Sequence, residues 1–238
     1  VRNALPALDQ AVDATVERLH GELGARLVYC GAGTSGRLAL QDGVELGPTF
    51  NWPQERLVTL LAGGLDSLAV AQEGAEDNEH AAREAVTKEA ITACDVVIGV
   101  AASGRTPFTL SVLREAKARG ALTVGLANDP TGHLLQIADI PVLLRTGPEV
   151  LAGSTRLAAG TAQKIALNLL STAVMVRLGK VFRGRMVDMR PTNEKLRTRA
   201  ATMVSEVADC SRQEAETVLR RHGGSIREAI IALEAERI

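Results

Sequence analysis

Short apolar runs that alternate with longer amphipathic stretches constrain the fold of this chain more than any other feature. The apolar runs are residues 26–30, 57–62, 96–101, 122–127 and 140–144. The stretches between them repeat their apolar residues at helical spacing. Runs such as 96–101 carry no polar residue to face solvent, as expected of strands that are buried on both faces. The alternation predicts an α/β fold, in which helices cover both faces of a five-stranded parallel sheet.

Helical spacing and capping residues extend this prediction to the whole chain. We expect helices at residues 7–24, 36–46, 67–89, 107–119, 134–138 and 158–178. The last segment has the pattern of a helix, a turn and a helix, with Ser211 as N-cap and Gly223 and Gly224 as the stop. We therefore expect two domains: residues 1–188, an α/β domain with an N-terminal helix, and residues 189–238, a small helical module.

Composition and charge exclude several classes of function. Aromatic residues make up 2% of the chain and its formal net charge is −1, so neither stacking on bases nor a general attraction to nucleic acid is expected. The longest apolar segment, residues 165–176, is shorter than the roughly 20 residues of a membrane span. The three cysteines are far apart and form no C-x-x-C pair. We expect a cytoplasmic protein without a nucleic-acid or membrane partner.

A glycine motif follows the first apolar run. Gly31, Gly33 and Gly36 have the G-x-G-x-x-G spacing of a dinucleotide-binding loop. Such a loop needs an acidic residue at the end of the second strand, but Glu55 lies before that strand. Thr34 and Ser35 place two hydroxyl groups at the start of a helix, where N–H groups and the helix dipole favour an anion. With Gly36, these residues are typical of a site for a phosphate monoester.

A second turn of the same kind follows the third apolar run. It contains Ser103, Gly104, Arg105 and Thr106, and Pro107 suits the first position of the next helix. Both turns are expected at the carboxyl end of a parallel sheet, where such sheets bind ligands. Either turn alone has an equally good interpretation as a capped strand-to-helix connection. The pair, which shares the sequence Ser-Gly-Arg, predicts one phosphate site.

Five stretches of the chain resemble a known family. The sequences GAGTSGRL, EGAEDN, AASGRTP, AGSTRLAAGTAQK and MVDMRPTNEKL are similar to the sugar isomerase (SIS) domain, and more closely to the N-acetylmuramic acid 6-phosphate etherases. The resemblance implies cleavage of a D-lactyl ether from a cell-wall sugar phosphate, giving N-acetylglucosamine 6-phosphate and D-lactate. It implies a homodimer, with no metal and no cofactor. The C-terminal helices resemble the module that ends these etherases, whose pattern is similar to ubiquitin-associated domains.

The resemblance also assigns roles to individual residues. It implies that Glu45, in QDGVE, is the proton donor, and that Glu76, the second glutamate of EGAED, is the base. Independently of the resemblance, Ser154 follows the last apolar run and is a candidate to close the sugar pocket, with a capping role as an equally good interpretation. Two carboxyl groups suit this elimination, because a base must take the C2 proton of the open-chain aldehyde and an acid must protonate the departing O3.

The position of Glu45 raises a question about the assembly. It lies ten residues after Ser35, which is about 15 Å along an unbroken helix at about 1.5 Å per residue. Either the helix bends near Gly43, or Glu45 serves the site of a partner subunit. We favour the second interpretation, which places the active site at or near a subunit interface.

Three other functions fit parts of the pattern. A non-catalytic sugar-phosphate sensor with regulatory function is the main alternative, because such a protein can retain both glutamates. An aldose–ketose isomerase also removes a C2 proton, but it has no need for an acid at O3. A sugar-responsive transcription factor needs a DNA-binding module, and the roughly 25 residues before the first strand are too few for three helices.

Overall fold

The chain forms two compact units. The computed structural model describes residues 1–22, 24–70 and 72–235. One unit comprises Val1–Val44 and Pro53–Val174, and the other comprises Glu45–Trp52 and Met175–Ile238. The domain limits expected from the sequence, 1–188 and 189–238, stay a prediction.

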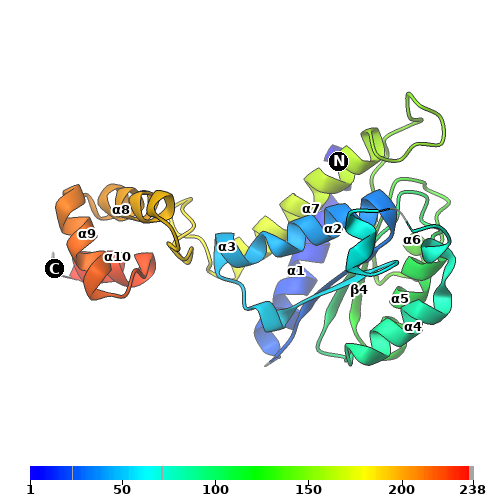
Figure 1. Ribbon diagram of the computed structural model, residues 1–238, viewed down its shortest axis with the longest axis horizontal. Coiled ribbons are helices and arrows are strands. Elements are labelled where there is room, and N and C mark those ends of the chain that lie inside the picture. The colour runs from blue at the N-terminus through cyan, green and yellow to red at the C-terminus, as the bar shows by residue number, and fades with distance from the viewer. Residues whose placement is uncertain (23, 71, 236–238) are drawn as a thin grey trace. The chain divides into compact units, whose positions relative to one another are not determined.

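The first unit contains the sheet that the sequence predicts. Its strands are β1 (Leu27–Gly31), β2 (Leu57–Leu61), β3 (Val96–Val100), β4 (Leu122–Ala127) and β5 (Ile140–Leu143). All neighbours are parallel, in the order β2-β1-β3-β4-β5 (Figure 1). The register pairs Leu27 with Val96 and Gly31 with Val100, so β1 and β3 end side by side. The five-stranded parallel sheet is thereby confirmed.

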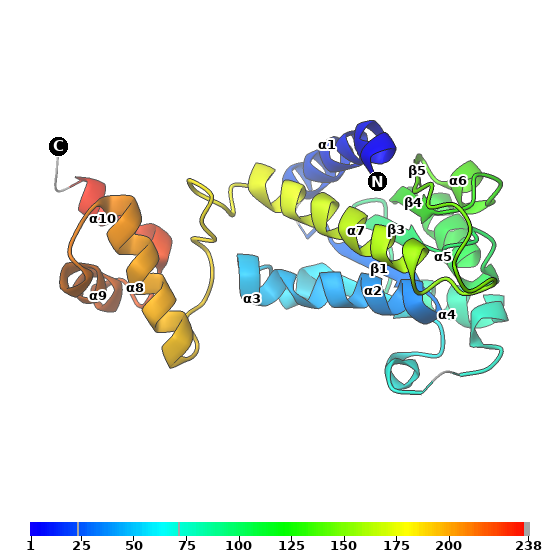
Figure 2. The ribbon, with the colours of Figure 1, turned by 90° about the horizontal axis from the view of Figure 1, so that it is seen from above.

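Helices cover both faces of this sheet, which confirms the expected three-layer fold. On one face lie α1 (Leu5–Gly21), α2 (Gly33–Val44) and α7 (Ala158–Arg177). The short turn η1 (Arg2–Ala4) precedes α1. On the other lie α4 (Glu79–Lys88), α5 (Pro107–Ala118) and α6 (Leu134–Ile137) (Figure 2). Alternate residues of each strand serve the two faces: Val28 and Cys30 pack in the core with Phe108, whereas Tyr29 points toward α2.

The long helix expected at residues 67–89 is wrong. The segment instead contains two short 3₁₀ turns, η3 (Leu65–Leu68) and η4 (Ala75–Asp77), before α4 begins at Glu79. Gly74 adopts a left-handed backbone with φ +69°, and the side chain of Asn78 caps α4 by accepting a hydrogen bond from the N–H of Ala81 at 2.9 Å. Glycine and asparagine favour these breaking roles, which apolar spacing alone does not reveal. A further 3₁₀ turn, η2 (Gln54–Arg56), precedes β2.

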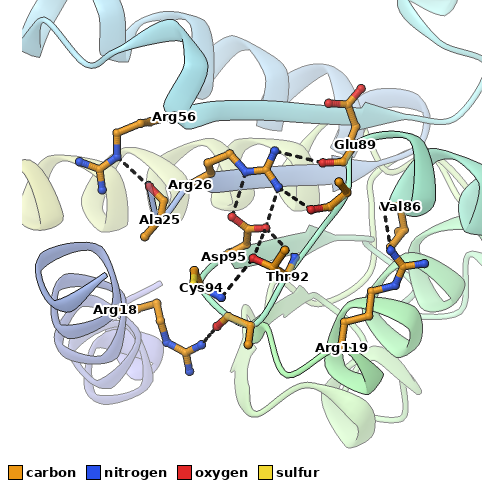
Figure 3. A network of polar contacts seen from close by, with 12 residues as sticks. Arg18, Ala25, Arg26, Arg56, Val86, Glu89, Thr92, Cys94, Asp95 and Arg119 are labelled. Atoms are coloured by element: carbon orange, nitrogen blue, oxygen red, sulfur yellow. Dashed lines mark hydrogen bonds and ion pairs between the residues drawn. The ribbon is translucent and has the colours of Figure 1, made fainter. Parts of the chain in front are cut away.

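Arginine side chains close the amino end of the sheet (Figure 3). Arg26 binds both carboxylate oxygens of Asp95, with N–O distances of 2.9 and 2.7 Å. The side chain of Asp95 is 1% exposed, and burial acts to raise its pKa. Hydrogen bonds from Arg26 and from the N–H of Thr92 outweigh burial, so the pKa of Asp95 lies below its ordinary value. Three further arginines donate to main-chain carbonyl groups nearby: Arg18, Arg56 and Arg119.

The second unit is helical. It contains α3 (Leu46–Phe50), α8 (Glu194–Ala208), α9 (Arg212–Arg221) and α10 (Ile226–Ala235), and its core includes Val204, Leu219 and Ile226. The hydroxyl group of Ser211 accepts a hydrogen bond from the N–H of Glu214 at 3.2 Å, which confirms the expected N-cap. Gly223 and Gly224 end α9 with positive φ, as expected. Of all the helices described in either unit, none has the length and apolar character needed to cross a membrane.

Candidate active site

The strand order creates a topological switch point at the carboxyl end of the sheet. From β1 the chain crosses to β2 at one edge, whereas from β3 it crosses in the opposite direction to β4. The connections that leave β1 and β3 therefore diverge between two neighbouring strands. In open parallel sheets, ligands bind at such a point. Both hydroxyl-bearing turns predicted from the sequence begin here.

The first turn starts α2 directly against β1. A Cβ atom on Gly36 would lie 2.7 Å from the carbonyl carbon of Gly31, and one on Gly31 would lie 2.8 Å from Cα of Gly36. Only glycine at both positions allows this approach. Thr34 and Ser35 occupy the first turn of α2, where N–H groups lack helical partners. Ser35 is buried and Thr34 is half-buried.

The second turn joins β3 to α5. Gly104 has φ +63°, and a Cβ atom there would lie 2.7 Å from Cα of Gly132. The hydroxyl group of Ser103 accepts a hydrogen bond from the N–H of Arg105 at 3.1 Å. Thr106 is the N-cap residue and Pro107 begins the helix, as expected, but the Thr106 hydroxyl makes no capping hydrogen bond. The helix therefore does not use this hydroxyl group.

Arg105 is held by the connection that follows β4. It donates to Asp129 at 2.7 Å and to the hydroxyl group of Thr131 at 2.5 Å. Hydrogen bonds from the hydroxyl and N–H groups of Thr131, and then from Arg105, lower the pKa of Asp129 to about 2. Asp129 was missed in the sequence, although its place directly after a parallel strand is a signal that could have found it.

The start of α7 lies beside the start of α2. A Cβ atom on Gly160 would lie 3.4 Å from Cγ2 of Thr34. The carboxylate of Glu149 caps α7 by accepting hydrogen bonds from the N–H groups of Ala158 and Ala159, each at 2.9 Å. Ser154 is half-buried in the connection between Glu149 and α7. The connection that carries Ser154 is thereby anchored to the first turn of α7, and Glu149 is a second residue that sequence reasoning missed.

The two glutamates lie outside these turns. Glu76 is exposed in η4, on the connection between β2 and α4, and it belongs to the first unit. Glu45 is exposed, has a helical backbone with φ −76° and ψ −13°, and joins α2 to α3 at the start of a segment of the second unit. In the part of the chain that the structure describes, no group of three or more His, Cys, Asp or Glu side chains is arranged to hold a metal ion.

Comparison with known proteins identifies relatives over nearly the whole chain. A curated N-acetylmuramic acid 6-phosphate etherase from Deinococcus radiodurans is 53% identical over 234 residues, which cover 98% of this chain and 76% of that protein. The protein of the same name from Rubrobacter xylanophilus is 48% identical over 98% of this chain and 77% of its own length. The SIS domain family matches residues 77–176, and the N-terminal SIS domain of the glucokinase regulatory protein matches residues 8–117.

Solved structures share the fold at low identity. A putative phosphosugar isomerase from Bacteroides fragilis has a TM-score of 0.54 and 20% identity, over 75% of this chain and 82% of that one. The NanR protein of Vibrio vulnificus, solved with ManNAc-6P, has a TM-score of 0.52 and 16% identity, over 75% of this chain and 61% of that one. At these identities the comparison shows the SIS fold.

Proposed function

We infer the function of this chain from the family to which it belongs, the N-acetylmuramic acid 6-phosphate etherases. It is a carbon–oxygen lyase that cleaves the D-lactyl ether of N-acetylmuramic acid 6-phosphate, giving N-acetylglucosamine 6-phosphate and D-lactate. The name of the curated relatives supports this lyase rather than the regulatory alternative. The residue roles, the assembly and the location that follow are proposals.

The phosphate group of the substrate binds between the two hydroxyl-bearing turns. One observation carries this assignment: Gly31 and Val100 end neighbouring parallel strands. Residues 34–36 and 103–106 therefore follow the carboxyl ends of two adjacent strands. Helix N-terminal N–H groups and the hydroxyl groups of Thr34, Ser35, Ser103 and Thr106 are suitable donors to a dianion. Gly36 and Gly104 allow the close approach of the backbone, Arg105 adds positive charge, and Ser154 faces the sugar.

The two glutamates perform the elimination. Glu76 takes the C2 proton of the open-chain sugar, whose C1 aldehyde makes this proton acidic. Glu45 donates a proton to the O3 atom as the bond between C3 and the lactyl oxygen breaks. Water then adds across the resulting double bond, with its hydroxyl group at C3 and a proton at C2. Each carboxyl group contributes roughly 10²–10⁴-fold to the rate, and the exposure of Glu76 leaves it accessible to a substrate.

The enzyme is a homodimer with its active site at or near the subunit interface. Ile165, Leu169 and Val176 of α7 are 44%, 43% and 47% exposed, and their spacing of four and seven residues places them along one side of the helix. Exposed apolar side chains in a row are typical of a subunit interface. A proton donor also needs an environment that keeps its proton near neutral pH, which burial favours. The exposed Glu45 gains that environment if a second copy covers it.

The location is the cytoplasm. Cys30 is buried and Cys94 is partly buried, and both carry thiols rather than a disulfide bond. This cysteine chemistry is typical of a reducing compartment.

Release of D-lactate from N-acetylmuramic acid 6-phosphate tests the reaction. The wild-type protein is expected to release it, and Glu45→Gln and Glu76→Gln are expected to lose roughly 10²–10⁴-fold in kcat. Glu73→Gln, a change in the same exposed connection as Glu76, is the control and should retain its rate. Absence of lactate from the wild type would overturn the lyase, and unchanged turnover of either variant would overturn the role of that glutamate.

Mixing the two inactive variants tests the shared site. If Glu45 and Glu76 of one site come from different subunits, a heterodimer of Glu45→Gln and Glu76→Gln contains one intact site. A mixture allowed to exchange subunits should then regain about a quarter of the wild-type activity. No recovery in exchanged heterodimers would show that both glutamates of a site belong to one chain.

A further inference from the structure

A buried carboxyl group near the end of α2 has no part in the mechanism above. Asp42 is 5% exposed and accepts three hydrogen bonds. They come from the hydroxyl group of Tyr29 in β1 at 2.9 Å, from Nδ2 of Asn168 in α7 at 2.6 Å, and from Oγ of Ser171 in α7 at 3.1 Å. One side chain thereby ties α2 to the sheet and to a second helix.

A buried carboxyl group of this kind contributes little to the stability of a core. Burial raises the pKa of Asp42, and hydrogen bonds from Asn168, Tyr29 and Ser171, together with the positive charge of Lys164, offset only part of that effect. All three donors are neutral, whereas Asp95 is buried against an arginine and its pKa is lowered. A buried carboxylate whose hydrogen-bond donors are all neutral contributes less to stability than an apolar side chain of similar size. The effect of Asp42 is therefore on geometry. Because it accepts hydrogen bonds from donors on β1 and α7, it fixes the position of α2.

The backbone beside Asp42 is held as closely as its side chain. A Cβ atom on Gly43 would lie 3.3 Å from Cδ2 of Tyr29 and 3.2 Å from Cδ1 of Leu57, so α2 packs on these side chains without one of its own. The fixed end of α2 continues directly to Glu45, which follows Asp42 by three residues and retains a helical backbone.

We propose that Asp42 is a positioning residue, which fixes the end of α2 and so determines where Glu45 presents its carboxyl group. The proposal rests on the proposed function, in which Glu45 is the proton donor. Asp42 acts through the geometry of its hydrogen bonds and not through its charge. An asparagine can keep the same network, because its Oδ1 atom accepts from Asn168 and Ser171 while its Nδ2 atom donates to the Tyr29 oxygen.

Two variants at this position test the proposal. Asp42→Asn is expected to keep kcat within about threefold of the wild type. Asp42→Ala is expected to lower kcat by about 10²-fold with little change in KM, because displacement of a catalytic group by about 1 Å has an effect of this size. Exchange of the substrate C2 proton with solvent deuterium should continue in Asp42→Ala, since this step depends on Glu76 and not on Glu45. If Asp42→Ala loses both the C2 exchange and the release of lactate, the cause is general structural damage.

The controls separate this proposal from the proposed function. Lactate release by the wild type and its loss in Glu45→Gln establish the function independently of Asp42. With these in place, wild-type kcat in Asp42→Ala, loss of C2 exchange in that variant, or an Asp42→Asn variant as slow as Asp42→Ala would each overturn the positioning role. If Asp42→Ala does not fold, Asn168→Ala removes one donor and leaves the carboxyl group in place. It should lower kcat about tenfold at constant KM, and an unchanged kcat would also overturn the proposal.

Discussion

The two ends of the parallel sheet are built from opposite kinds of residue. At the amino end, arginine side chains bind carbonyl groups and one buried carboxylate, so the polar groups there are satisfied within the protein (Figure 3). At the carboxyl end, short side chains with hydroxyl groups follow β1 and β3, and the Thr106 hydroxyl makes no capping bond. The arginine side chains at the first end thus bind groups of the protein itself, whereas the second end carries the hydroxyl groups proposed to bind the substrate.

Each end also contains an arginine–aspartate pair, and the pairs differ in burial. In the pair at the amino end, the side chains of Arg26 and Asp95 are 20% and 1% exposed. In the pair at the carboxyl end, those of Arg105 and Asp129 are 47% and 34% exposed. Water screens the second pair, so it contributes little to stability. We therefore expect changes at the amino end to affect stability first, and changes at the carboxyl end, where the proposed substrate site lies, to affect activity first.

The largest expected effect is on stability, from Asp95→Ala. This change leaves the Arg26 charge partly buried without its partner, and it should lower the free energy of unfolding by about 3–5 kcal/mol. Urea denaturation measures the loss, and kcat of the folded variant should stay within twofold of the wild type. A large fall in kcat would contradict the division between the two ends.

A smaller effect, on activity, is expected from Gly104→Ala at the carboxyl end. The added Cβ atom would meet Cα of Gly132 at 2.7 Å and the backbone has φ +63°, so the turn that carries Ser103 must move. We expect kcat/KM to fall by about 10²-fold. Gly21→Ala is the control, because a Cβ atom there meets nothing within 4 Å. Equal activity in the two variants would show that the turn does not bind substrate.

Removal of one hydroxyl group sharpens the comparison further. Thr106→Val preserves shape but removes a proposed donor to the phosphate, and it should raise KM about tenfold with stability nearly unchanged. Thr109→Val is a matched control on the same helix, since the buried Thr109 hydroxyl has no hydrogen-bond partner among the described residues. Thr109→Val should leave KM unchanged and should not lower stability. A normal KM in Thr106→Val would remove that residue from the site.

The smallest expected effect is in the acid range of pH. The pKa of Asp95 is lower in the folded protein than its ordinary value, so its contribution to stability is complete above the unfolded-state pKa of about 3.9. That contribution is lost as the pH falls through the folded-state pKa. The free energy of unfolding should therefore decrease less steeply below about pH 4 in Asp95→Ala than in the wild type. Parallel curves for the two proteins would contradict the lowered pKa.

Much of the fold could be predicted because it depends on local patterns. The apolar runs place all five strands, and Ser211 and Pro107 mark helix starts where the structure has them. The helix expected at 67–89 was wrong because Gly74 and Asn78 break it, and apolar spacing does not register a single left-handed residue. At the site, the hydroxyl groups and glycines were visible in the sequence. The place of Asp129 after a strand was visible too, but the partners of Asp129 and Glu149 were not, because they lie 24 and 9 residues away along the chain.

The order of amino acids by itself determined the alternation of strands and helices, the two glycine turns and the family. Each of these features depends on which residues stand within a few positions of one another in the sequence, because helix capping, turn formation and apolar periodicity involve only near neighbours. Only the tertiary structure decided that β1 and β3 are neighbours, that Arg26 closes one end of the sheet, and that Asp42 joins Tyr29 to α7. Those outcomes depend on which elements pack together, and packing brings together residues as far apart as Asp42 and Asn168, which are separated by 126 positions.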